Sequence, residues 1–192
     1  MNILAEPQVH LWTRDEYYKM AEVGLFEGKA VELIEGQVIE MSPMGSRHAT
    51  AITLIARVLE RAFGEGYFIR WQMPLAIDEK SEPEPDVAVV AGHVRDYKDA
   101  HPTTAALIVE VAETSLEYDR TIKGSLYAKA GIADYWIVNL NDRQLEVYRT
   151  PVANAVYPGS FGYADKVILT TAASVSPLVA QQMKVPVSDL LP

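Results

Sequence analysis

Two short apolar runs, each interrupted by one carboxylate, constrain this chain more than any other feature. The first run covers residues 85–90 (PDVAVV) and the second covers residues 107–111 (LIVEV). Both are rich in β-branched residues, which is typical of buried strands. Because strand side chains alternate between two faces, Asp86 and Glu110 each share a face with the aliphatic residues two positions away. Both acids are therefore predicted to point where water is scarce.

A lysine completes a candidate site. If the two strands are neighbours, their carboxylates repel by about 4 kcal/mol at about 4 Å and an effective dielectric constant near 20, and a bound cation removes that cost. Lys123 lies early in a helix predicted over residues 119–130, on the same face as Leu126 and Tyr127. The lysine therefore starts on the buried side and can extend toward Glu110. Asp86, Glu110 and Lys123 together predict a metal-plus-ammonium site suited to a phosphodiester.

Each of the two acids also has a purely structural interpretation. An acid within LIVEV must pair, coordinate or shift its pKa, so the structural alternative for Glu110 is an ion pair with Arg120 or Lys123. The structural alternative for Asp86 is a strand-entry residue bonded to turn amides. The presence of all three charged residues, Asp86, Glu110 and Lys123, favours the catalytic interpretation.

Several motifs carry a family resemblance. Pro85-Asp86 followed by Glu110 and a lysine resembles the PD-(D/E)XK nuclease superfamily. Between residues 107 and 139 the segments IVEV, YDR, YAKAGI and DYWIVN resemble more closely the Uma group of restriction-endonuclease-like proteins, and the likeness extends back through ELIEG (32–36), MSP (41–43) and Arg47-His48. The superfamily places its lysine two residues after the glutamate, where this chain has Ala112. The resemblance implies that Lys123, on the following helix, takes that role.

The resemblance implies a fold and a function. We expect an α/β domain with a restriction-endonuclease-like mixed sheet, flanked by helices and preceded by an N-terminal β-hairpin. The expected function is a divalent-metal-dependent DNA endonuclease, in which Asp86 and Glu110 hold Mg²⁺ or Mn²⁺ and Lys123 orients the attacking water or stabilises the developing charge. The alternatives are a phosphoester hydrolase acting on RNA or nucleotides, and an inactive binding or scaffold module of the same fold.

Composition sets further limits. With 192 residues, 49% of them hydrophobic, the chain is predicted to form a single domain over residues 1–192. The absence of cysteine excludes disulfides and thiolate metal sites and suits the cytoplasm. No segment approaches the roughly 18 consecutive apolar residues of a membrane span. The apolar C-terminal residues 172–192 are expected to cover the sheet or a partner subunit, and a homodimer is expected because duplex cleavage must address two strands.

Net charge is the main observation against DNA binding. The chain carries 17 basic and 26 acidic residues, a net charge of −9, whereas proteins that hold DNA usually present a basic face. A local cationic rim around the site remains possible. Its candidate members are Arg47, Arg57, Arg61, Arg70, Arg120 and Lys123.

Three further residues are candidates for the edge of the site. Glu32 and Glu35 lie in a predicted hairpin with strands at 31–34 and 37–41, and solvated acids are the alternative interpretation of both. His48 lies at the N-terminal end of a helix predicted from a Ser46 cap to Phe63, on its core-facing side. That position suits a role beside a phosphate, although a lone histidine there is more often a packing residue.

The rest of the chain is assigned from its turn and capping signals. Thr13 fits the capping box of a short helix over 15–21, and Trp136 and Tyr148 are expected in the core or in an interface. The polar residues 91–104 are predicted to form a solvated connection, with a cover for the site as the alternative. The remaining expected elements are strands at 67–77, 134–140, 144–149 and 166–171, and a mobile loop at 151–163.

Overall fold

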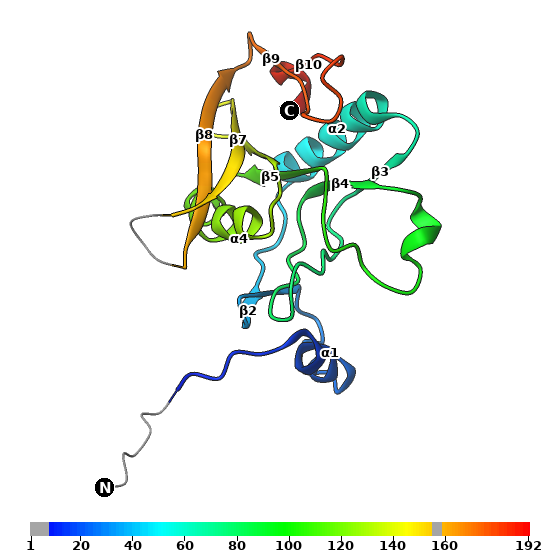
Figure 1. Cartoon of the computed structure of the whole chain (residues 1–192), viewed down its shortest axis with the longest axis vertical. Coiled ribbons are helices and arrows are strands. Elements are labelled where there is room, and N and C mark those ends of the chain that lie inside the picture. Colours follow the sequence, from blue (N-terminus) through cyan, green and yellow to red (C-terminus); the bar gives the residue numbers. More distant parts are fainter. Residues whose placement is uncertain (1–7, 155–158) are drawn as a thin grey trace, which may run out of the picture.

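The computed structural model describes residues 8–154 and 159–192, and at its centre lies a six-stranded mixed sheet (Figure 1). The strand order is β3-β4-β5-β6-β7-β8; β5 and β6 run parallel, and every other neighbouring pair is antiparallel. The strands are β3 Tyr67–Arg70, β4 Val87–Ala91, β5 Leu107–Ala112, β6 Asp134–Asn139, β7 Gln144–Ala153 and β8 Phe161–Thr170. The predicted mixed α/β sheet is confirmed.

Helix α2 (Ser46–Phe63) covers one face of the sheet. The C-terminal residues pack beside it as β9 (Ser174–Val175), β10 (Val185–Pro186) and η3 (Val187–Leu190), and Trp136 is fully buried in the same core. The prediction that the C-terminal residues cover the sheet is confirmed.

A second helical segment covers the opposite face. It consists of α3 (Leu116–Tyr118), a π-helical turn η2 (Asp119–Lys123) and α4 (Gly124–Lys129). The segment ends at Gly131, whose φ of 74° suits glycine, with hydrogen bonds from Ile132 N to Tyr127 O and from Gly131 N to Ala128 O. This is the predicted Schellman-type stop. Tyr127, Tyr135 and Tyr148 form the core on this side of the sheet.

The N-terminal part forms a separate lobe. Helix α1 (Arg14–Glu22) begins with the predicted Thr13–Glu16 capping box. It is followed by the predicted hairpin of β1 (Val31–Ile34) and β2 (Gln37–Glu40). Glu35 and Gly36 turn the hairpin with positive φ angles of 47° and 78°, as a two-residue turn requires. In Figure 1 this lobe lies at the end of the molecule opposite the C-terminal residues.

Several predicted boundaries are wrong, and the backbone explains why. Helix α2 is capped by Gly45, with Ser46 inside the helix, and the second helical segment starts at Leu116. Strand β3 ends at Arg70 because Gln72 adopts a left-handed φ of 49°. The 91–104 loop contains a short helix, η1 (Val94–Tyr97).

The predicted loop at 151–163 is also wrong in part. Thr150 takes a φ of 58°, after which β7 continues to Ala153, with Pro151 opposite Tyr163 of β8. Residues 155–158 of the predicted loop lie outside the described residues. Within the described part of the chain, no helix has the length and apolar character needed to cross a membrane.

Candidate active site

The pairing of β4 with β5 brings the two strand acids together. Val87 lies opposite Val109 in this antiparallel pair, so Asp86, one residue before β4, comes beside Glu110. The backbone N–H of Asp86 donates to Glu110 Oε2 at 3.1 Å, and the N–H of Val111 donates to Asp86 Oδ2 at 2.8 Å. The prediction that these strands are neighbours and that their acids meet is confirmed.

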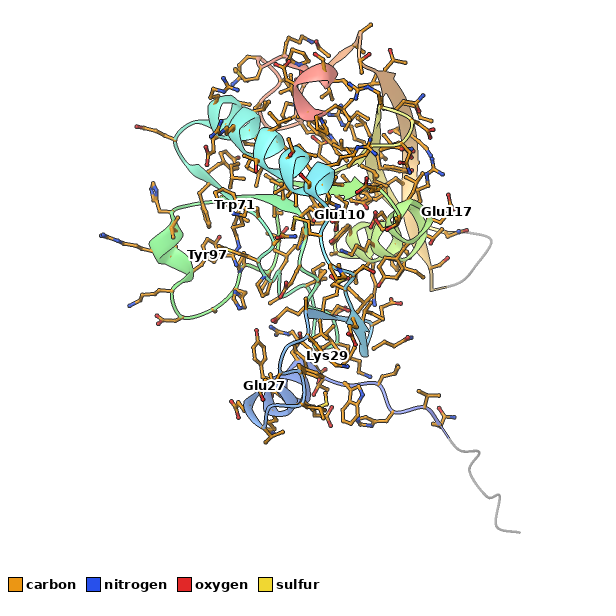
Figure 2. All side chains as sticks on the ribbon, turned by 180° about the vertical axis from the view of Figure 1, so that it is seen from behind. Glu27, Lys29, Trp71, Tyr97, Glu110 and Glu117 are labelled. Carbon is orange, nitrogen blue, oxygen red and sulfur yellow. The ribbon has the colours of Figure 1, made fainter. Side chains whose placement is uncertain are left out.

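Lys123 reaches the same place from the helical segment. Its Nζ lies 3.1 Å from Glu110 Oε1 and 3.4 Å from Glu32 Oε2, and the residue is only 2% exposed. The hydroxyl of Tyr127, one helical turn further on, donates to the same Glu110 oxygen at 2.7 Å. The lysine therefore points inward, as its position on the helix face predicts. Figure 2 shows Glu110 near the N-terminal end of α2, in the middle of the molecule.

Asp119 is a member of this cluster that the sequence did not reveal. It is the first residue of the helix predicted over residues 119–130, yet it is 3% exposed and accepts a hydrogen bond from Ser115 Oγ at 2.5 Å. It opens the π turn that ends at Lys123, and single π turns in helices are frequent at functional sites. The spacing of four residues between Asp119 and Lys123 was the available signal, since it predicts neighbours on one helix face.

His48 also joins the site. Its Nε2 lies 2.9 Å from Asp86 Oδ1, at the first turn of α2. Burial lowers the pKa of His48, but the hydrogen bond to Asp86 and the negative charges of Asp86, Glu113 and Asp119 outweigh it and raise the pKa above its usual value. The His48 and Asp86 side chains are 20% and 13% exposed, against 3% for Lys123 and Glu110. The site therefore opens to solvent at the His48–Asp86 end.

Of the two hairpin acids, only Glu32 belongs to the cluster. It is fully buried, and its Oε2 accepts a hydrogen bond from the N–H of Glu84 at 3.0 Å in addition to the contact with Lys123. Its Oε1 has no hydrogen-bond partner among the described residues. Glu35, at the hairpin turn, lies instead 3.7 Å from Lys129 and is exposed.

The cluster has more negative than positive charge. The ammonium of Lys123 lies within ion-pair distance of Glu110 and Glu32, and the negative charges of Asp119 and Asp86 also act on it. Burial raises the pKa of Glu110 to about 8, with Asp86 and Asp119 acting in the same direction and Lys123 opposing them. Burial likewise raises the pKa of Asp119 to about 6. Burial lowers the pKa of Lys123, but the surrounding carboxylates outweigh it, so the lysine stays charged at neutral pH.

These residues fit a divalent metal ion. Among residues 8–154 and 159–192, no three or more aspartate, glutamate, histidine or cysteine side chains are grouped so as to hold a metal ion by themselves. Mg²⁺ does not need such a cage, since it binds through one or two carboxylates and keeps several waters. Asp86 and Glu110 supply hard oxygen donors, and the unpartnered oxygen of Glu32 and the excess negative charge both favour a cation.

Three arginines of the candidate cationic rim contact other groups of the protein. Arg47 lies 3.2 Å from Glu113, and Arg120 is paired with Glu117 and Glu146 at 2.6 and 2.5 Å. Arg70 is buried, and its guanidinium donates to the carbonyl of Pro74. These three arginines are therefore already engaged within the protein.

The 91–104 loop does not cover the site. Its short helix packs Tyr97 against Phe68, and the Tyr97 hydroxyl donates to the carbonyl of Ala91. Figure 2 shows Tyr97 on a projection at the side of the molecule, away from Glu110. The alternative that this loop reaches over the site is therefore wrong, and the predicted solvated connection agrees with its mostly exposed residues.

Comparisons with known proteins agree with this geometry. A crystal structure of a putative nuclease belonging to DUF820 from Anabaena variabilis is similar, with a TM-score of 0.69 and 16% sequence identity over 93% of this chain and 96% of that chain. An identity this low shows the fold alone. No curated protein matches the chain. The family model Uma2, described as "Putative restriction endonuclease", matches residues 14–187. The chain therefore belongs to the Uma2 family of putative restriction endonucleases.

Proposed function

We propose that this protein is a divalent-metal-dependent nuclease that hydrolyses phosphodiester bonds in DNA, with Asp86 and Glu110 as metal ligands. One observation carries the proposal: four carboxylates converge on one buried lysine, and the pKa of Glu110 is raised to about 8. Such a cluster is poorly balanced without a further cation, and the proposal is supported by membership of a family of putative restriction endonucleases and by a fold shared with a putative nuclease.

Each residue has a distinct role in this proposal. Bound Mg²⁺ supplies Lewis-acid polarisation of the scissile phosphate and lowers the pKa of an attacking water. Tyr127 and Lys123 hold the carboxylate of Glu110 in place by hydrogen bonds to Oε1. The ammonium of Lys123 orients the water or stabilises the negative charge that develops on the phosphoryl oxygens. His48, at the solvent-facing end, holds Asp86 and can exchange a proton with water there.

A cleavage assay tests the proposal. Supercoiled plasmid, linear duplex, single-stranded DNA and RNA are incubated with Mg²⁺, with Mn²⁺ or with a chelator. We expect metal-dependent cleavage that is lost in Asp86→Asn and Glu110→Gln. Glu35→Gln is the matched control, because Glu35 shares the ELIEG motif with Glu32 but lies outside the cluster. Cleavage retained in both site variants contradicts the assignment, and cleavage of RNA alone redirects it to ribonucleases.

The second candidate is an inactive binding module of the same fold. It is favoured by the fact that all four carboxylate oxygens of Asp86 and Glu110 already have hydrogen-bonding partners within the protein. The two candidates differ in their response to metal. A nuclease gains thermal stability with Mg²⁺ or Mn²⁺, by about 2.7 kcal/mol at a hundredfold excess over Kd, whereas a module with structural acids gains nothing.

A further inference from the structure

An exposed apolar segment lies directly after β3. Trp71 is 46% exposed and Met73 is 45% exposed, and Gln72 between them is also exposed. Large apolar side chains that face solvent together often mark a binding surface. This 71–73 segment contains neither the proposed metal ligands nor the lysine of the proposed site.

The 71–73 segment is tied to the backbone of the proposed metal ligand. The N–H of Gln72 donates to the carbonyls of Pro85 and Asp86, at 3.0 and 3.2 Å. Gln72 holds a left-handed φ of 49°, which is uncommon for a residue other than glycine, and this conformation ends the strand and turns the segment toward Asp86. Figure 2 shows Trp71 and Glu110 both beneath α2, in the middle of the molecule.

The charge of the protein limits how it can hold a nucleic acid. The net charge is −9, and Arg47, Arg120 and Lys123 are each paired with carboxylates. Phosphate neutralisation by these residues therefore contributes little to binding. Stacking of a base on an aromatic ring needs no positive charge, and it requires a base whose face is not already covered by its neighbours in a duplex.

We propose that the 71–73 segment binds an unpaired base of the substrate, with the indole of Trp71 stacked on it, next to the phosphodiester held at Asp86. The inference rests on the proposed function and adds a substrate class: single-stranded or locally unwound nucleic acid.

Binding measured in a chelator separates this inference from catalysis. Fluorescence anisotropy is recorded with three labelled ligands: a single strand, its duplex, and a strand of the same length with abasic sugars. The proteins are wild type, Trp71→Ala, Trp71→Phe and the control Trp12→Ala, which removes a second partly exposed indole near the hairpin turn. We expect the single strand to bind tightest and Trp71→Ala to weaken it roughly 5- to 100-fold, with Phe restoring most of the affinity and Trp12→Ala matching wild type.

Salt provides a second readout. If stacking dominates, affinity falls by less than about tenfold between about 50 and about 200 mM salt, because few phosphates are neutralised. Equal binding of the abasic strand, or an unchanged Trp71→Ala, overturns the inference while leaving the nuclease proposal intact. Failure of wild type to bind any of the three ligands in the chelator also overturns the inference, whereas the nuclease proposal is decided separately by the metal-dependent cleavage assay. A Trp71→Ala protein that binds normally but changes its mass in light scattering shows that the segment is a contact between copies of the chain, which also overturns the inference.

Discussion

The pH dependence of stability offers a sharp test of the charge imbalance at Glu110. Burial and neighbouring acids raise the pKa of this carboxyl from 4.5 to about 8 in the folded protein. Because the folded pKa lies above the unfolded one, the contribution of Glu110 to stability is fully present below pH 4.5 and is lost as pH rises through 8. At about pH 7 the free energy of unfolding has fallen by about 3 kcal/mol, because each pH unit above the unfolded pKa costs about 1.4 kcal/mol.

The substitution Glu110→Gln removes this ionisable group and nearly preserves the shape of the side chain. The amide keeps one oxygen for Tyr127 and Lys123 but turns its NH₂ toward the N–H of Asp86, so it loses one hydrogen bond, at a cost of about 1 kcal/mol. Without metal near pH 7, the variant should therefore be more stable than wild type by about 2 kcal/mol, or about 4 to 8 °C in Tm. The two stability curves should cross near pH 5.

Thermal and urea unfolding of the two proteins in a chelator, from about pH 4.5 to about pH 8, measures this difference. The control is Glu117→Gln, an acid whose side chain is 77% exposed, which should follow wild type at every pH. If Glu110→Gln is less stable than wild type at every pH, and its curve of stability against pH runs parallel to that of wild type, Glu110 is an ordinary ion-paired acid. The inference that the cluster needs a further cation would then be refuted.

Three further predictions follow from the structure. Lys123→Ala should abolish cleavage and also lower stability by about 3 to 5 kcal/mol in urea unfolding, because Lys123 is buried among four acids; an active or fully stable variant contradicts its placement. Hydrogen bonds and ion pairs with Arg120, Lys166 and Tyr148 lower the pKa of Glu146 to about 2 despite its burial. The contribution of Glu146 to the stability of the folded protein should therefore be lost as pH falls from 4.5 through 2, and Glu146→Gln should flatten that part of an acid titration followed by circular dichroism. Self-association should appear in light scattering at concentrations on the order of tens of micromolar, since the edge strand β8 exposes Val167 and Ile168, and a monomer at those concentrations counts against it.

The elements predicted correctly have local signals. The Glu35-Gly36 turn, the Thr13 capping box and the Gly131 stop each depend on residues within a few positions of one another, and each appears in the structure. The meeting of Asp86 and Glu110 was also predictable, because an acid in a buried strand needs a partner and two such strands follow each other in the chain.

The features that were missed depend on contacts distant in sequence. The left-handed Gln72 is stabilised by carbonyls at Pro85 and Asp86, so nothing within the 67–77 stretch predicts the end of β3. The rim arginines were expected at the site because the sequence does not show which carboxylates they pair with; Arg120 of η2 pairs with Glu146 of β7. Lys123 was expected on the buried side of its helix, but its contact with Glu32 of the distant hairpin became visible only in the structure.

The π turn at Asp119–Lys123 has a consequence for how such a site can be gained or lost. A turn that closes from i to i+5 holds one residue more than an α-helical turn, and here the extra length is accommodated on the outside, where Thr121 and Ile122 are exposed. Deleting Thr121 would tighten the turn to α-helical geometry and move Lys123 relative to Asp119, with no change in the sheet. A single-codon deletion in this helix can therefore move the Lys123 ammonium away from the site while the two strands that carry Asp86 and Glu110 keep their sequences. The reverse insertion can restore it.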